Sequence, residues 1–240
     1  MRIAMWSGPR NLSTAMMRSF ASRSDTFVTD EPFYSAFLKE SMLPHPGAEE
    51  VIRNHESDWK AVLKHLNGPI PDGKKIWYQK HMAHHLLPGM DCDWVQDFRH
   101  AFLIRDPVAV VASLTGFIHY PTLRDTGLPQ QAAIFHAVKR WTGKIPPVID
   151  CKDLLADPRG MLSKLCARLE IPFEESMLSW KAGIHPTDGC WAKHWYAKVA
   201  QTTGFEAAKE KRITTPEELE PILFGCKEIF SFLYENRIVP

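Results

Sequence analysis

Short apolar runs alternate with longer amphipathic segments along most of the chain. Five runs have the length and composition of buried strands: residues 2–6, 27–29, 75–79, 101–104 and 147–150. Apolar residues at helical spacing predict helices in five other places: from residue 12, from residue 107, and over residues 132–141, 158–169 and 217–234. Strands that alternate with helices predict an α/β fold, here a three-layer sandwich in which helices cover both faces of a mainly parallel central sheet.

Length and composition fit one folded domain spanning residues 1–240. The chain is 45% hydrophobic and 24% charged, and its net charge is +1. Such a balance gives no long-range field toward nucleic acid or an anionic membrane, so any anion site must be built locally. No apolar run reaches the length of a membrane span or of a signal-peptide core, and we expect no membrane partner and no export.

The five cysteines are dispersed, and no CxxC spacing occurs. This pattern indicates neither a zinc knuckle nor a disulfide framework, and it predicts reduced thiols in the cytoplasm. Nothing in the sequence bears on the oligomeric state.

The first chemical signal is the turn SGPRNLST at residues 7–14, between the first strand and the first helix. A helix N-terminus exposes unpaired N–H groups and the positive end of the helix dipole, so this turn can bind a phosphate or sulfate. Arg10 adds a permanent charge, and Ser13 and Thr14 add hydroxyl groups. A P-loop of the GxxxxGK[ST] type would require a lysine before Ser13, and the turn has none. From the turn alone, a plain connection capped by Ser13 is an equal alternative.

A second signal follows the strand at residues 101–104. Arg105-Asp106-Pro107 ends this strand, and Ser113 lies eight residues after Arg105. Open α/β sheets bind ligands at the carboxyl ends of their strands, which is where Arg105 is expected.

These two signals, in this order, resemble the sulfotransferase superfamily. The segment PRNLST at residues 9–14 is similar to the 5′-phosphosulfate loop of that family, although Asn11 and Leu12 depart from the usual serine and glycine. Arg105 and Ser113 match its 3′-phosphate pair. The segments DLLADP at 153–158, LCARLEIPF at 165–173 and GCWAKHW at 189–195 resemble later family motifs.

The resemblance implies a P-loop-NTPase-like sulfotransferase fold. It also implies that the co-substrate is 3′-phosphoadenylyl sulfate (PAPS) and that no metal is required. Arg10 would stabilise charge on the leaving phosphate, and the implied donor-binding residues are Pro9, Arg10, Asn11, Leu12, Ser13, Thr14, Arg105 and Ser113. Lys80 is a candidate contact to the sulfate and Lys193 a candidate contact to the 3′-phosphate through a late loop, although both are more commonly surface lysines.

Two residues are candidates for the base that activates the acceptor. Glu31 follows the second strand, and related bacterial sulfotransferases have a glutamate at a comparable place. Its alternative role is shared with Asp30: either could cap a helix that begins near Pro32. His81 resembles the histidine of the family's KTH segment, one residue out of register, and imidazole titrates near neutral pH. We expect the surrounding histidines, His84 and His85, to form a solvated polar surface without a metal.

The predicted function is therefore transfer of a sulfuryl group to a hydroxyl or amine of a small acceptor. Residues 34–72 and 116–130 are expected to shape the acceptor pocket. Two alternatives remain open: a P-loop-type nucleotide kinase or hydrolase, which needs magnesium, and a non-catalytic module that binds PAPS or its bisphosphate product, PAP.

Overall fold

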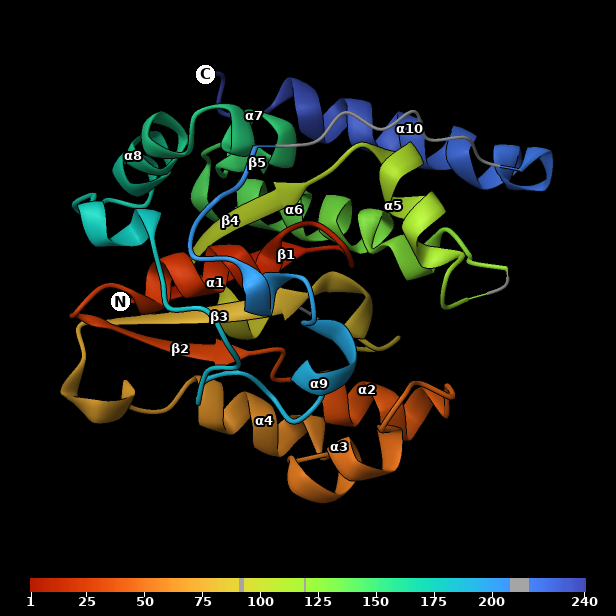
Figure 1. The fold of residues 1–240 in the computed structure, drawn as a ribbon, viewed down its shortest axis with the longest axis horizontal. Helices are drawn as coiled ribbons and strands as arrows, with labels where there is room; N and C mark the ends of the chain where they lie inside the picture. Colours follow the sequence, from red (N-terminus) through yellow and green to blue (C-terminus); the bar gives the residue numbers. More distant parts are fainter. Residues whose placement is uncertain (91–92, 119, 208–215) are drawn as a thin grey trace.

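The centre of the protein is a five-stranded, wholly parallel sheet (Figure 1). It is seen in a computed structural model that describes residues 1–90, 93–118, 120–207 and 216–240. The strand order is β2-β3-β1-β4-β5. The strands are β1 (Arg2–Ser7), β2 (Thr26–Asp30), β3 (Ile76–Met82), β4 (Arg99–Ile104) and β5 (Val148–Asp150). β1, β2 and β4 include their predicted runs in full, whereas β3 and β5 each begin one residue later than the predicted run.

Side chains of the strands point alternately to two cores, which produces the three layers. In β1, Ile3 and Met5 enter one core, and Ala4 and Trp6 enter the other. The first core is completed by α1 (Ser13–Ala21), α7 (Cys151–Ala156) and α8 (Pro158–Arg168). The second is completed by α4 (Trp59–Leu66), α5 (Pro107–Leu114), α6 (Leu128–Thr142) and α10 (Glu220–Glu235). The predicted α/β fold is thus confirmed.

A third, smaller core lies near the β2 end of the sheet. It is formed by α2 (Tyr34–Ser41), α3 (Ala48–Asn54) and α9 (Ala192–Trp195), which Figure 1 shows grouped below β2. Here α9 belongs to a segment, residues 179–204, that we call the strap. Its ends are joined by an antiparallel bridge between Ser179 and Gly204. The strap therefore returns residues from late in the sequence to the carboxyl edge of the early strands.

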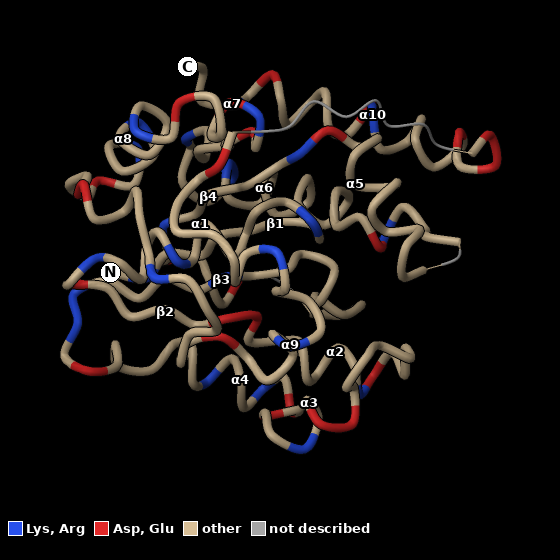
Figure 2. Tube along the Cα trace, viewed as in Figure 1, with Lys and Arg blue, Asp and Glu red and all other residues tan. Residues whose placement is uncertain are grey.

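Charges of both signs are interspersed over the trace, as Figure 2 shows. Among the described residues, no helix is long and apolar enough to cross a membrane. The described cysteines, at 151, 166, 190 and 226, are all unpaired, and Cys92 lies outside the described residues.

Candidate active site

The turn between β1 and α1 adopts an unusual backbone conformation. Arg10 and Leu12 both have positive φ, 65° and 58°, in the left-handed region that favours glycine. Leu12 is also the N-cap residue of α1, and its side chain forms no capping hydrogen bond. Gly8 allows the turn to approach the segment before α6, because a Cβ atom there would lie 2.2 Å from the Thr126 carbonyl oxygen. The close approach of Gly8 to the segment before α6 therefore constrains the shape of the turn.

The structure brings Arg10, Arg105 and Ser113 together, whereas the sequence analysis assigned Arg10 to the leaving phosphate and the other two residues to the 3′-phosphate. Nε of Arg10 donates to the Ser113 hydroxyl at 2.9 Å, and Nη1 of Arg105 donates to the Arg10 carbonyl oxygen at 2.8 Å. Within the described part of the chain, neither guanidinium forms an ion pair with a carboxylate. Burial, followed by the nearby charge of Arg105, lowers the pKa of Arg10. Two adjacent cations without a counter-ion form a site for an anion.

The remaining loop residues contact the strands beside them. Pro9 lies in the turn, and the Asn11 amide donates to the Leu103 carbonyl oxygen at 3.2 Å. Ser13 approaches the Met82 sulfur at 3.8 Å, and the hydroxyl of Thr14 accepts a hydrogen bond from Lys80 at 3.0 Å. The side chains thus anchor the loop, while the first N–H groups of α1 have no capping side chain.

Lys80, near the carboxyl end of β3, is the central residue of a buried hydrogen-bond network in the site. Its ammonium group is 1% exposed. Four oxygens lie within hydrogen-bond distance of Nζ and share its three N–H groups: Thr14 Oγ1 at 3.0 Å, Asp30 Oδ1 at 2.8 Å, Glu31 Oε1 at 2.7 Å and the Tyr196 hydroxyl at 2.6 Å. Burial alone would lower the pKa of Lys80, but the two carboxylates more than offset it, and the pKa is raised. The expectation of a surface lysine is wrong. Through Thr14, the ammonium group links the turn of residues 7–14, which we call the anion loop, to Glu31.

Glu31 is held at one oxygen only. Its Oε1 accepts from Lys80, and from the Tyr196 hydroxyl at 3.3 Å, whereas Oε2 lies 4.0 Å from Nδ1 of His85. The side chain is 12% exposed. Burial raises the pKa of Glu31, Lys80 opposes this shift, and the charge of Asp30 adds to it. One oxygen is thus fixed and the other is available to accept a proton.

The capping interpretation of Asp30 and Glu31 is wrong. Helix α2 starts at Tyr34, and no side chain caps its N-terminus. Instead, Glu31 has a positive φ of 38°, and its backbone N–H bonds to the Lys80 carbonyl oxygen at 3.0 Å. This conformation turns the chain at the end of β2 so that both carboxylates face Lys80.

His81 points away from Lys80, because successive residues of a strand face opposite sides of the sheet. Its ring is 1% exposed and stacks on Trp6 at 4.6 Å, and its Nε2 pairs with the Gln79 amide oxygen at 3.1 Å. Burial lowers the pKa of His81 to about 3. This environment is that of a core histidine, and it favours Glu31 as the base.

The expected solvated histidine surface is also wrong. β3 continues to Met82, and the next turn folds His84 and His85 beneath α2. His85 is 3% exposed, and burial lowers the pKa of His84 to about 3. No group of three or more His, Cys, Asp or Glu side chains that could hold a metal occurs among the described residues.

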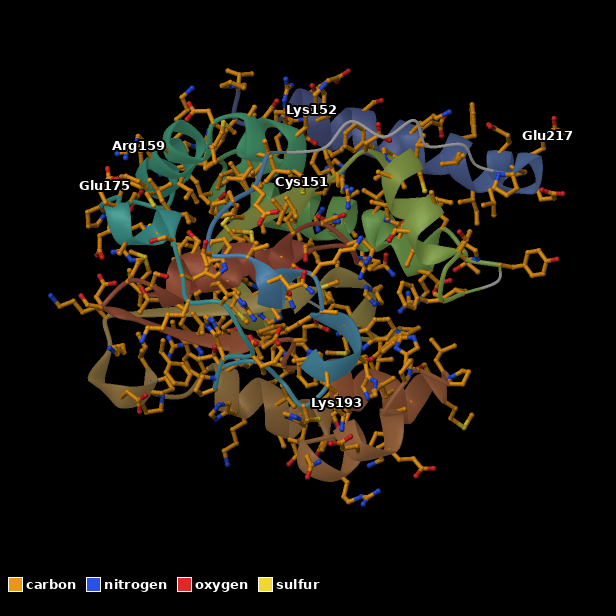
Figure 3. All side chains as sticks on the ribbon, viewed as in Figure 1. Cys151, Lys152, Arg159, Glu175, Lys193 and Glu217 are labelled. Atoms are coloured by element: carbon orange, nitrogen blue, oxygen red, sulfur yellow. The ribbon has the colours of Figure 1, made fainter. Side chains whose placement is uncertain are left out.

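Lys193 lies elsewhere. Its ammonium pairs with the Glu50 carboxylate of α3 at 2.5 Å, on the exposed surface. In Figure 3 Lys193 is beside α3, far from Cys151, which begins the helix after β5. The structure therefore brings Lys193 to α3 and does not bring it to Arg105.

Residues of the strap also reach the site, and they could not be identified as site residues from the sequence. The Tyr196 hydroxyl lies 2.7 Å from Asp30 Oδ2, and the Gly189 N–H donates to the same oxygen at 3.2 Å. The strap is fixed by a buried ion pair between Arg18 and Asp188 at 2.9 Å. The one available signal was Arg18 itself, a charged residue among the apolar residues of the first helix.

One cavity, of about 300 Å³, adjoins the site at Glu31 and is also lined by Ser35, His55, Trp191 and residues of α4. A second, of about 430 Å³, is lined by Phe37, Trp59 and Arg124 among others, and its lining includes none of the residues around Lys80. Both include residues from the stretch 34–72 that was expected to form the acceptor pocket.

The chain belongs to the sulfotransferase domain family, whose sequence pattern matches residues 1–216. Three solved sulfotransferase structures share the fold over nearly the whole chain. A sulfotransferase domain from the curacin biosynthetic pathway has a TM-score of 0.53 at 18% identity, covering 99% of this chain and 98% of that one. A domain from the olefin synthase of Synechococcus PCC 7002 has a TM-score of 0.54 at 18% identity, covering 100% and 96%. A sulfotransferase from Alicyclobacillus acidocaldarius has a TM-score of 0.57 at 13% identity, covering 99% and 96%.

Two curated relatives from Arabidopsis thaliana are longer than this chain. Branched-chain-amino-acid aminotransferase-like protein 2 is 36% identical over 96% of the chain and 41% of its own length. Branched-chain-amino-acid aminotransferase-like protein 1 is 39% identical over 89% of the chain and 38% of its own length. The chain thus spans about two fifths of these relatives, and its assignment to a single domain stays a prediction.

Proposed function

We propose that the protein is a PAPS-dependent sulfotransferase that transfers the sulfuryl group to a hydroxyl or amine of a small acceptor. The observation that carries the proposal is the pair of unpaired guanidinium groups, Arg10 and Arg105, beside the anion loop, with Glu31 linked to that loop through Lys80. A bisphosphorylated nucleotide needs two anion sites, and the two guanidinium groups and the N-terminus of α1 at this edge of the sheet support that assignment.

In this proposal, Arg105, Ser113 and the guanidinium of Arg10 bind the 3′-phosphate. The N–H groups at the start of α1 and the hydroxyls of Ser13 and Thr14 bind the 5′-phosphosulfate. Lys80 stabilises negative charge that develops on the sulfuryl oxygens and the leaving phosphate. The proposed role of Arg10 therefore moves from the leaving group toward the 3′-phosphate, because its side chain lies on Ser113.

The reaction proceeds in line. The acceptor oxygen or nitrogen attacks sulfur, the bond between sulfur and the 5′-phosphate oxygen breaks, and the electron pair leaves on that phosphate. The proton of the acceptor passes to Oε2 of Glu31. Because burial raises the pKa of Glu31, the rate should rise with pH through the titration of this carboxyl group.

Calorimetry with the product nucleotide tests the donor assignment. Adenosine 3′,5′-bisphosphate should bind more tightly than AMP, and Arg105→Gln should weaken only the bisphosphate, by roughly 10- to 100-fold, the range for a lost hydrogen bond to a charged group. Equal affinity for the two nucleotides would contradict the proposal. Magnesium-stimulated ATP turnover would instead indicate the kinase or hydrolase.

Glu31→Gln tests the chemistry. The amide keeps the shape of the carboxyl but cannot take a proton, so nucleotide affinity should be retained while sulfate transfer falls by a factor on the order of 10² to 10⁴. Tight bisphosphate binding without sulfation of any acceptor in a metabolite extract would favour the non-catalytic module.

A further inference from the structure

His85 is held in a fixed orientation between two aromatic rings. The imidazole, at the end of the turn Ala83–His85, stacks on Tyr34 with ring centroids 4.8 Å apart and on Phe37 at 4.7 Å. The angles between the planes are 9° and 25°. Both rings come from α2, which follows Glu31 directly. The stack therefore fixes where the ring nitrogens of His85 point.

One of these nitrogens faces the free oxygen of Glu31. Nδ1 of His85 is buried and has no hydrogen-bond partner. It lies 4.0 Å from Oε2 of Glu31, too far for a direct hydrogen bond. Two atoms at this separation can both contact one oxygen atom placed about 2.8 Å from each. A buried, unpartnered nitrogen of this kind requires an explanation, and a bound ligand atom supplies one.

His85 is neutral at pH 7. Burial is the main cause of a pKa well below the ordinary histidine value, and neighbouring groups that are positively charged when protonated add to it. The groups that act in this direction are His84, His45, Lys80 and His81. We assign the single ring proton to Nδ1, because a lone pair there would face the carboxylate of Glu31. Nδ1 then offers a hydrogen-bond donor without adding a positive charge beside the base.

We propose that His85 is a second residue that contacts the acceptor: its Nδ1–H donates to the acceptor oxygen while Oε2 of Glu31 takes the proton from the same atom. The proposal rests on the proposed sulfuryl transfer. Lys80, Asp30 and Tyr196 surround the other oxygen of Glu31, so only Oε2 is directed to this position.

The two contacts define what the acceptor atom must be. It must donate one hydrogen to Glu31 and present a lone pair to His85. As its bond to sulfur forms, its proton moves to Oε2, and the electron pair of the breaking bond leaves on the 5′-phosphate. Alcohols and phenols satisfy both contacts and keep a second lone pair for the attack on sulfur. A neutral amine has a single lone pair, which cannot both accept from His85 and attack sulfur, and an ammonium group has none, so the site selects hydroxyl acceptors.

Two substitutions separate this role from packing. His85→Phe keeps the aromatic stack between Tyr34 and Phe37 but has no N–H group. His85→Asn loses the stack but places an amide N–H near the position of Nδ1. Packing alone predicts that phenylalanine is tolerated better than asparagine, and the proposal predicts the reverse order for turnover.

The assay uses PAPS with water as the acceptor and measures release of inorganic sulfate. His85→Phe should lower the rate by roughly 10- to 100-fold with an unchanged dissociation constant for the bisphosphate, and His85→Asn should recover most of it. Wild-type rates in His85→Phe, or a loss in His85→Asn as large as in His85→Phe, would overturn the proposal. If Glu31→Gln also leaves the rate unchanged, it is the proposed function that fails.

A second measurement does not depend on turnover. In carboxyl-labelled protein followed by NMR, the titration midpoint of Glu31 should move upward in His85→Phe, because the N–H group favours the charged carboxylate through a bridging water. His85→Asn should leave the midpoint near that of the wild type. An identical midpoint in all three proteins would overturn the assignment of His85.

Discussion

Removal of the Lys80 ammonium is the most informative perturbation of the site. In Lys80→Met the apolar stem is kept, but Asp30 and Glu31 lose the cation that they share. Removing one partner of a buried ion pair costs about 3–5 kcal/mol, because the remaining charge is left without compensation. In a domain of this size, 1 kcal/mol corresponds to a Tm change of roughly 2–4 °C. We therefore expect Tm at pH 7 to fall by roughly 6–20 °C.

The effect should depend on pH in one direction. The pKa of Glu31 is already raised in the folded protein, and Lys80 is the main influence that opposes this shift. Without Lys80 the folded-state pKa rises further above the unfolded value. A carboxyl group whose pKa is higher in the folded than in the unfolded state stabilises the fold below its unfolded-state pKa. This stabilisation is lost as pH rises through the folded-state pKa. The destabilisation of Lys80→Met should thus be largest at neutral pH and shrink near pH 4.

Urea or thermal unfolding at both pH values measures this difference. Lys193→Met is the matched control, because it removes an ammonium that pairs with Glu50 on the surface, and it should leave Tm unchanged. Adding Glu31→Gln to Lys80→Met should restore part of the lost stability, since one uncompensated charge is gone. A loss of the same size at pH 4 and pH 7 would show that the carboxylates are not its source.

Three further substitutions probe the loop, the strap and the rival base. Gly8→Ala should distort the anion loop, because the new Cβ would meet the Thr126 carbonyl oxygen at 2.2 Å, and the bisphosphate affinity should fall in calorimetry. Arg18→Leu leaves Asp188 buried without its cation, so the strap should become susceptible to limited proteolysis before the rest of the domain unfolds. His81→Phe keeps the stack on Trp6 and should retain the pH–rate profile of the wild type; loss of its ascending limb would identify His81 as the base.

The sheet could be predicted because each strand contains a short apolar run that can be recognised from its own residues alone. The small helices α2 and α3, between residues 34 and 54, were not, since they lack long apolar stripes and depend on packing against α9 from the strap. The placement of Arg10 and Arg105 at one edge of the sheet could be predicted, because both residues follow strands and neighbouring parallel strands end at the same edge.

The role of Lys80 could not be predicted in the same way. Its partner Tyr196 is 116 residues away, and no local pattern relates the two. A lysine followed by histidines indicates a polar surface by composition, yet β3 runs three residues beyond the predicted apolar run and takes Lys80 and His81 into the interior. Whether residues at the end of a central strand are buried depends on which other segments pack over that end of the sheet. Here these segments are the strap and α2.

The position of Tyr196 in the chain affects the order in which the protein can acquire activity. A nascent chain that has emerged only to residue 178 already contains all five strands, both arginines and Glu31, and can form most of the nucleotide site. The ammonium of Lys80 would then lack one of its four oxygens, and Asp30 would be open to water. Competence for transfer should therefore appear during synthesis only after nucleotide binding, when residues 179–204 have closed over the early strands.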